Sequence, residues 1–124
     1  MIAGVGTDLC PASRWQHLLD RFGEKAPRRV LHEEEAAYLL AGNRQRLAER
    51  LAGRWALREA FGKALGVGLD GWSWKQLRFL NGRLWAEGEL ADLLAGRGIG
   101  RIHGSVSHDG GMAFAVVILE TGAP

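Results

Sequence analysis

The pattern of apolar and polar positions at the start of the chain predicts a strand followed by two helices. Residues 2–9 form an apolar, partly β-branched run, which favours a buried strand. Apolar side chains recur at helical spacing in residues 13–22, where Ser13 is the expected N-cap. Residues 33–40 are expected to form a second helix, because the glutamates that open this segment suit the positive end of a helix dipole.

A long helix is expected over residues 44–65, with Asn43 as its N-cap. Gly66 readily takes the left-handed conformation that ends a helix. Large apolar side chains repeat at intervals of four along this segment, in two series: Leu47, Leu51 and Trp55, then Leu57, Phe61 and Leu65.

After this helix the pattern changes to that of a β-hairpin. Residues 72–80 and 83–86 are expected to be strands, since Asn81-Gly82 between them is a strong signal for a two-residue turn. A brief helix is then expected over residues 89–94.

A second hairpin closes the chain, with arms at residues 101–107 and 112–120 and Asp109-Gly110-Gly111 at its turn. Helices therefore lie between a first strand and C-terminal hairpins, which predicts an α+β fold with an antiparallel sheet. The length of 124 residues suits a single domain, and the 47% hydrophobic content is that of a globular chain.

Composition narrows the class of protein further. Cys10 is the single cysteine, so an internal disulfide is excluded. The longest apolar run, residues 112–119, is far shorter than a membrane-spanning helix, and the chain opens without a basic signal segment. We therefore expect a cytoplasmic protein.

The net charge of +2 is small, but 13 of the 16 cations are arginine, and cations outnumber acids between Arg44 and Lys63. Arginine binds phosphate and carboxylate with a planar fork of donors, so the excess favours an anionic ligand or an acidic protein partner. A GC-rich genome would give the same excess without such a ligand.

Two segments carry acidic groups in apolar surroundings. Asp8 ends the first strand, where an acid is either a turn former or a ligand for a hard cation. Glu59 and Lys63 lie about 40° apart on one face of the long helix, either as a surface ion pair or as part of a site. Arg54 lies about 140° from Glu59, so a phosphate bound by Arg54 would belong to a site built with a neighbouring chain.

The histidines do not indicate a zinc site or a hydrolase. His103 and His108 flank a strand segment without metal-ligand spacing, and no G-x-S-x-G elbow is present. The remaining set of carboxylates, a lysine, a histidine and arginines suits magnesium-assisted work on a phosphate ester.

With these motifs in place, the sequence resembles the acyl carrier protein synthase family of small 4'-phosphopantetheinyl transferases. The resemblance covers nearly the whole chain, and its middle segment is the most specific. Three segments carry it in the family's order: Gly4-Val5-Gly6-Thr7-Asp8-Leu9, Arg54-Trp55-Ala56-Leu57-Arg58-Glu59-Ala60-Phe61-Gly62-Lys63-Ala64-Leu65-Gly66, and Ser105-Val106-Ser107-His108 with Ala113-Phe114-Ala115-Val116-Val117.

The resemblance implies transfer of phosphopantetheine from coenzyme A to a serine of apo acyl carrier protein, in fatty acid biosynthesis, with release of adenosine 3',5'-bisphosphate. It implies that Asp8 and Glu59 hold Mg²⁺, and that Glu59 and Lys63 are catalytic. It also places Arg14, Arg54, Lys63 and His108 at coenzyme A.

The sequence departs from the family's pattern at four places. Leu84 follows Gly82-Arg83 where proline is common, and Asp109 follows the motif histidine where threonine is common. Gly62 stands where a residue with a small side chain is usual, and Pro11-Ala12 stands where an acidic residue is common shortly after the first strand. These departures bear on carrier specificity and on the affinity for coenzyme A.

Two other functions are weighed beside this one. A related transferase could serve polyketide or siderophore carriers instead. A small nucleic-acid-binding module would use the basic segment between Arg44 and Lys63, but the modest net charge opposes it.

The resemblance further implies a homotrimer with the nucleotide site at the subunit boundary. Large apolar residues give a weaker, independent reason: Trp72 and Trp74 are expected to alternate on a strand beside Gly71, and residues 112–119 are apolar on both faces. A generous monomer core is the alternative explanation for these residues.

Overall fold

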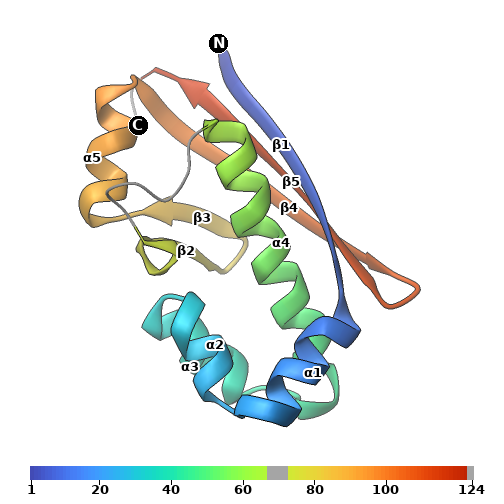
Figure 1. The fold of residues 1–124 in the computed structure, drawn as a ribbon. Helices are drawn as coiled ribbons and strands as arrows, with labels where there is room; N and C mark the ends of the chain where they lie inside the picture. The colour runs from blue at the N-terminus through green and yellow to red at the C-terminus, as the bar shows by residue number, and fades with distance from the viewer. Residues whose placement is uncertain (67–72, 123–124) are drawn as a thin grey trace.

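In the computed structural model, residues 1–66 and 73–122 are described (Figure 1). Most elements lie where the sequence pattern predicts them. In chain order they are β1 (Ile2–Pro11), α1 (Ala12–Phe22), α2 (Lys25–Val30), α3 (Glu33–Leu40), the 3₁₀ turn η1 (Arg44–Arg46), α4 (Leu47–Leu65), η2 (Trp74–Gln76), β2 (Leu77–Leu80), β3 (Arg83–Ala86), α5 (Gly88–Gly96), β4 (Ile99–Asp109) and β5 (Met112–Thr121).

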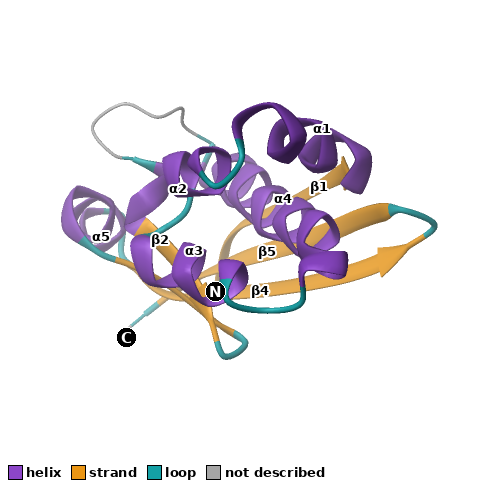
Figure 2. Cartoon of the chain, turned by 90° about the horizontal axis from the view of Figure 1, so that it is seen from below, coloured by secondary structure: helices purple, strands orange, loops and turns teal. Residues whose placement is uncertain are grey.

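The described strands form two antiparallel sheets. The larger has the order β1-β5-β4, and the smaller is the β2-β3 hairpin. Helix α4 lies across one face of the larger sheet, and α1, α2 and α3 gather near its N-terminal end (Figures 1 and 2). This architecture confirms the predicted α+β fold, with one long helix and several short ones against an antiparallel sheet.

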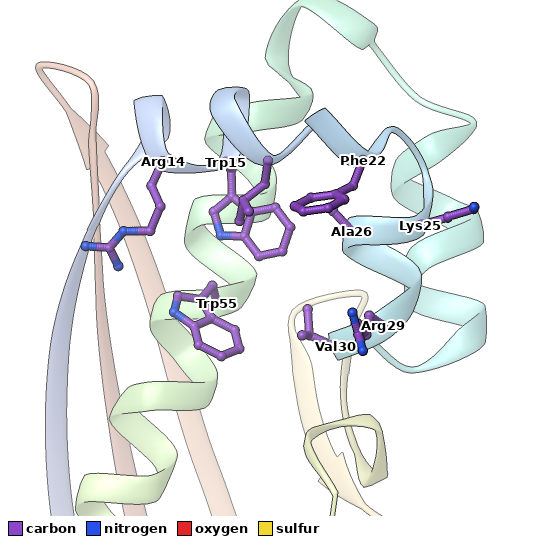
Figure 3. Close-up of a pocket in the computed structure, with 9 residues that line it drawn as sticks. Arg14, Trp15, Phe22, Lys25, Ala26, Arg29, Val30 and Trp55 are labelled. Atoms are coloured by element: carbon purple, nitrogen blue, oxygen red, sulfur yellow. The ribbon is translucent and has the colours of Figure 1, made fainter. Parts of the chain in front are cut away.

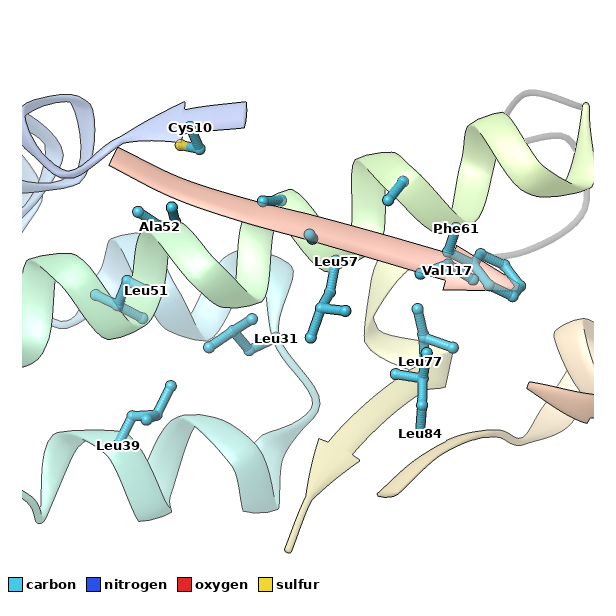
Figure 4. Packing of buried hydrophobic residues seen from close by; sticks show 14 of the residues in the cluster. Cys10, Leu31, Leu39, Leu51, Ala52, Leu57, Phe61, Leu77, Leu84 and Val117 are labelled. Carbon is cyan, nitrogen blue, oxygen red and sulfur yellow. The ribbon is translucent and has the colours of Figure 1, made fainter. Parts of the chain in front are cut away.

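Glycines in β1 allow α4 to pack closely on the sheet. A Cβ atom at Gly6 would lie 1.9 Å from the carbonyl oxygen of Ala60, and one at Gly4 would lie 2.0 Å from that of Ala64. Both distances are impossible for a real side chain, so only glycine at these positions lets the backbones of β1 and α4 approach this closely. The hydrophobic core fills the space between α4, the sheet and the short helices (Figure 4).

A buried ion pair crosses the interior between α3 and α4. Arg58 and Glu35 are both 0% exposed, and the two arginine Nη atoms bond the two carboxylate oxygens at 2.7 and 3.2 Å. Arg58 also donates to the carbonyls of Leu77 and Trp74, and Glu35 accepts the backbone N–H of Phe79. One carboxylate and one guanidinium thereby join α3, α4 and the β2 segment.

The prediction that the first strand is buried is wrong. Ile2, Val5 and Leu9 are more than half exposed, at 61%, 56% and 57%. The reason is that β1 is an edge strand of a sheet that α4 covers on one face only. For the same reason β5 is not buried on both faces: Phe114 remains 42% exposed, although Ala115 is fully buried.

Two helix starts differ from their predictions. Helix α1 begins at Ala12 directly after Pro11, without a side-chain cap, so Ser13 is not the N-cap. The strand runs straight into this helix, and the backbone N–H of Ala12 bonds the carbonyl of Gly111 instead. Asn43 does cap the next segment, but its first three residues form η1, and α4 starts after them.

The middle of the chain contains the remaining differences. Helix α2 was not predicted, and the expected strand over residues 72–80 begins only at Leu77, after the 3₁₀ turn that contains Trp74. Trp74 lies in this turn and not on a strand, and Trp72 and Gly71 of the expected alternation lie outside the described residues. The Asn81-Gly82 turn is confirmed, with φ values of 54° and 73°.

We expect Glu35→Gln to lower the free energy of unfolding by about 3–5 kcal/mol, because it leaves the buried Arg58 without its counter-charge. Urea denaturation measures the change. Glu33→Gln, an exposed substitution on the same helix, is the matched control and should stay within about 0.5 kcal/mol of wild type. Equal stability of the two variants would show that the buried pair contributes little.

Candidate functional site

Acidic and basic side chains from β1 and α4 meet at the edge of the sheet. Lys63 Nζ lies 2.9 Å from Asp8 Oδ1 and 3.1 Å from the carbonyl oxygen of Thr7. The side chain of Asp8 is 17% exposed and that of Lys63 is 57% exposed. Of the two alternatives for Lys63, a local surface pair with Glu59 is therefore not what forms: the ion pair joins two elements.

Glu59 lies in the same group of charges. Burial raises the pKa of its carboxyl, and the negative charge of Asp8 raises that pKa further, while Lys63 and Arg14 partly offset both effects. A half-buried carboxylate beside a second carboxylate favours a cation between them. The arrangement therefore has the charge of a cation site.

Arg14 reaches this group from α1. Its Nη1 lies 3.9 Å from the sulfur of Cys10, the second residue after Asp8 on β1. Burial raises the pKa of the Cys10 thiol, so this cysteine is not a reactive nucleophile. The structure thus brings together four residues that the sequence singled out: Asp8, Arg14, Glu59 and Lys63.

The two carboxylates fit magnesium better than they fit a metal that takes all its ligands from the protein. Among the described residues no group of three or more histidine, cysteine, aspartate or glutamate side chains is placed to hold a metal ion. Magnesium usually takes one or two carboxylates and completes its shell with water and substrate phosphate oxygens. Asp8 and Glu59 supply that number of carboxylates, and the half-buried Glu59 lacks a full counter-charge.

His108 lies on the other flank of α4. Ala113 on the central strand pairs with Cys10 on one side and with His108 on the other. The Nε2 atom of His108 lies 3.0 Å from the carbonyl oxygen of Glu49, in the first turn of α4. Within one chain, the central strand and α4 therefore separate this histidine from the Asp8 side of the sheet.

Arg54 is largely engaged inside the chain. Its Nε lies 3.1 Å from Glu35 Oε2, its side chain is 14% exposed, and its guanidinium lies 4.8 Å from the centre of the Phe79 ring. Burial lowers the pKa of Arg54, and the nearby Glu35 partly restores it. The structure therefore gives Arg54 an intramolecular carboxylate partner, and its expected contact with coenzyme A stays a prediction.

A cavity that sequence reasoning missed adjoins the charged group. It has a volume of about 450 Å³ and lies between α1, α2 and α4 (Figure 3). Trp15 and Trp55 contact each other edge to face, with ring centres 6.4 Å apart. Helical spacing had marked both residues as apolar, but α2, which forms one wall, was not predicted. The residues lining the cavity are Arg14, Trp15, Leu18, Phe22, Lys25, Ala26, Arg29, Val30 and Trp55.

The departures from the family pattern find local explanations. A Cβ atom at Gly62 would lie 3.4 Å from the Trp74 ring, so glycine leaves room for this indole. Leu84 is buried against Gly104, where it takes part in the core. Asp109 lines a small pocket with His108, which places a carboxylate beside that imidazole. Pro11 and Ala12 form the junction of β1 and α1.

Comparison with known proteins decides the family. The family model described as "4'-phosphopantetheinyl transferase superfamily" matches residues 4–116 of this chain. The chain belongs to this superfamily. The matched span contains every residue of the charged group on β1, α1 and α4.

Several relatives match over almost their full length. A holo-[acyl-carrier-protein] synthase of Thermus thermophilus is 39% identical, over 99% of this chain and 97% of the relative. The crystal structure of holo-[acyl-carrier-protein] synthase from Neisseria meningitidis has a TM-score of 0.88 at 29% identity, covering 98% of this chain and all of that chain. A holo-(acyl-carrier-protein) synthase of Bacillus anthracis, solved in complex with CoA (3',5'-ADP), has a TM-score of 0.78 at 30% identity, covering 98% and 99%.

No described helix is both long and apolar enough to cross a membrane. The segment whose apolar run was the longest in the sequence forms β5, the central strand of the sheet.

We expect Glu59→Gln to be more stable than wild type at neutral pH in the absence of a divalent ion. The folded protein raises the pKa of Glu59, so ionising this carboxyl costs stability as the pH rises through the unfolded and then the folded value. Glutamine carries no charge and avoids that cost. Melting temperatures measured from pH 3 to pH 8 should differ most at neutral pH and converge below the ordinary pKa of glutamate. A wild-type advantage at pH 7 would contradict the assignment.

Proposed function

We propose that this chain is a holo-[acyl-carrier-protein] synthase that transfers 4'-phosphopantetheine from coenzyme A to a serine of apo acyl carrier protein. Adenosine 3',5'-bisphosphate is the second product. The observation that carries the proposal is the Asp8–Glu59–Lys63 group, held between β1 and α4 in a chain that matches holo-[acyl-carrier-protein] synthases over almost its full length. Fatty acid biosynthesis is the pathway class that such a carrier serves.

Magnesium is the metal that we propose for Asp8 and Glu59. When bound, it would neutralise negative charge on the pyrophosphate of coenzyme A as the carrier serine attacks the β-phosphorus. Asp8 offers an oxygen at the surface of the sheet edge, and Glu59 offers one from the half-buried face of α4. These two side chains set where the pyrophosphate lies relative to α4.

The cations of the group act on the same phosphates. Lys63 is more than half exposed and would exchange Asp8 for a phosphate oxygen, where it would stabilise the departing bisphosphate. Arg14 approaches from α1 and adds a second positive charge. The carboxylate of Glu59 or a water bound to the magnesium ion would accept the serine proton.

A homotrimer in the cytoplasm is the state that we propose for this enzyme. The sheet face opposite α4 exposes Val5, Leu9 and Phe114, which is an apolar surface that a lone chain leaves in water. His108 lies across α4 from Asp8 in one chain. A nucleotide that contacts both His108 and Asp8 would therefore lie between two neighbouring chains, each supplying one of the two residues. These observations support a site at the boundary between copies.

Two other functions, transfer to other carriers and nucleic-acid binding, are the alternatives to this activity. A transferase dedicated to polyketide or siderophore carriers would use the same chemistry, and a panel of apo carriers distinguishes it. A nucleic-acid-binding module is disfavoured, because Arg58 is fully buried and Arg54 is paired with Glu35, so the basic segment of α4 does not present a continuous charged face.

Glu59→Gln should reduce transfer of phosphopantetheine at least a hundredfold while the fold survives, because the amide is a poor ligand for magnesium and cannot accept the serine proton. Mass spectrometry of the carrier after incubation with coenzyme A and magnesium measures the product. Glu33→Gln makes the same change of charge on exposed α3 and should retain wild-type activity. A panel of apo carriers that wild type leaves unmodified would overturn the proposed activity itself.

Light scattering at micromolar concentration should give a mass of three subunits for wild type. Phe114→Asp should shift the protein to smaller species, because it places a charge on the apolar face of the central strand. Tyr38 is 54% exposed on α3, away from that face, so Tyr38→Asp is the matched control and should remain a trimer. A wild-type mass of one subunit would contradict the assembly.

A further inference from the structure

A second cavity lies between β3, α5 and β4, at the edge of the larger sheet opposite β1. It has a volume of about 500 Å³ and is lined by residues 83–86 of β3, residues 99–103 of β4, and Ala91, Leu94 and Ala95 of α5. Figure 1 shows α5 beside β3 and beside the start of β4. The transfer chemistry described above uses none of these residues.

Free strand edges line this cavity on two sides. Among the described strands, β4 pairs only with β5 and β3 pairs only with β2, so each keeps one edge without a ladder partner. Successive side chains of a strand point to opposite faces, yet every residue in both runs lines the cavity. The backbone edges of both strands therefore border it, and their N–H and C=O groups are a template for a further strand.

The face of the cavity toward the core is apolar. Leu84 of β3 is buried and lies against Gly104 of β4, and the cavity opens from this contact toward Ile99. Leu94 of α5 belongs to the core, and Ile102 of β4 packs against it. A strand that entered the cavity would meet apolar side chains on this face.

The outward face of the cavity is basic. Arg83, Arg101 and His103 line the cavity and are exposed, and no acidic residue lines it. The imidazole of His103 lies 3.1 Å from the carboxylate of Glu120. In the described part of the chain neither Arg83 nor Arg101 forms a salt bridge. Two guanidinium groups at the cavity therefore lack carboxylate partners.

We propose that β3 and β4 bind an extended, acidic segment of a partner polypeptide, which adds as a strand between them. The segment alternates apolar residues, which face α5 and Leu84, with acidic residues, which face Arg83 and Arg101. Complementary charge selects an acidic segment over a basic one, and main-chain hydrogen bonds select an extended segment over a compact anion. The inference does not depend on the proposed transfer reaction.

Calorimetric titration with a capped peptide of about six residues that alternates valine and glutamate tests the proposal. The Arg83→Gln/Arg101→Gln double variant loses both unpaired cations, so its Kd should rise on the order of tenfold. Arg46→Gln/Lys75→Gln removes the same charge from exposed residues outside the cavity, and its Kd should stay within about twofold of wild type. A peptide with lysine in place of glutamate should not bind.

Amide hydrogen exchange shows whether the peptide binds as a strand. Saturating peptide should slow exchange on the order of tenfold for amides of β3 and β4 that border the cavity. Amides of β1, the strand at the other edge of the larger sheet, should be unchanged. A peptide N-methylated at alternate residues keeps its charge but loses the donors to one edge, so it should bind on the order of tenfold more weakly.

Three results would overturn the proposal. They are no binding of the acidic peptide to the folded wild-type protein, equal affinity of the double variant and its control, and unchanged exchange in β3 and β4 at saturation. Binding of decanoate in place of the peptide, with the same dependence on Arg83 and Arg101, would assign the cavity to a small amphiphilic anion and overturn it too. Transfer activity, measured in the same preparation, tests the proposed function separately.

Discussion

The bidentate pair between Glu35 and Arg58 is the interaction on which the arrangement of the helices depends. Neither charge reaches solvent, so each needs the other, together with the backbone groups of the β2 segment that complete their hydrogen bonds. Arg58 precedes Glu59 on α4, so the pair fixes the rotation of the helix at the point where the site begins. The carboxylate of Glu59 then faces β1, because its neighbour is held on the side of α3. The buried arginine and the proposed functional carboxylate are thus adjacent in the sequence but face different elements.

Glycine on the strand and alanine on the helix complete this placement. The absence of side chains at Gly4 and Gly6 lets α4 approach β1 until the backbones nearly touch. A larger residue at either position would move α4 away from the sheet and would separate Asp8 from Lys63. The distance of 2.9 Å between these two side chains therefore depends on residues that carry no chemistry of their own.

Sequence patterns predicted the positions of the helices and strands better than they predicted which faces are buried and which residues contact one another. Turn residues such as Asn81-Gly82 act locally, and the structure confirms them. Burial of β1 could not be predicted in the same way, because an apolar strand has the same sequence pattern whether its second face is covered by another element or left exposed. The ion pair of Arg54 with Glu35 was missed for a related reason: the two residues are distant in the sequence, and only the packing of α3 on α4 brings them together. Asp8, Glu59 and Lys63 were found because strand end and helical spacing marked them, with the family resemblance giving their roles. The cavity was missed because α2 was not predicted.

The bond between Lys63 and Asp8 has a consequence for how a metal ion would enter the site. In the free chain the ammonium group of Lys63 lies against Asp8 Oδ1 and offsets its negative charge, so this edge of the sheet does not need a divalent ion to balance that carboxylate. Under the proposed function, an ion bound at Asp8 Oδ1 would displace this ammonium group, and the lysine would become free to contact the phosphates. Metal entry and placement of the lysine would then be a single exchange of partners, in which one cation leaves a carboxylate as the other takes its place.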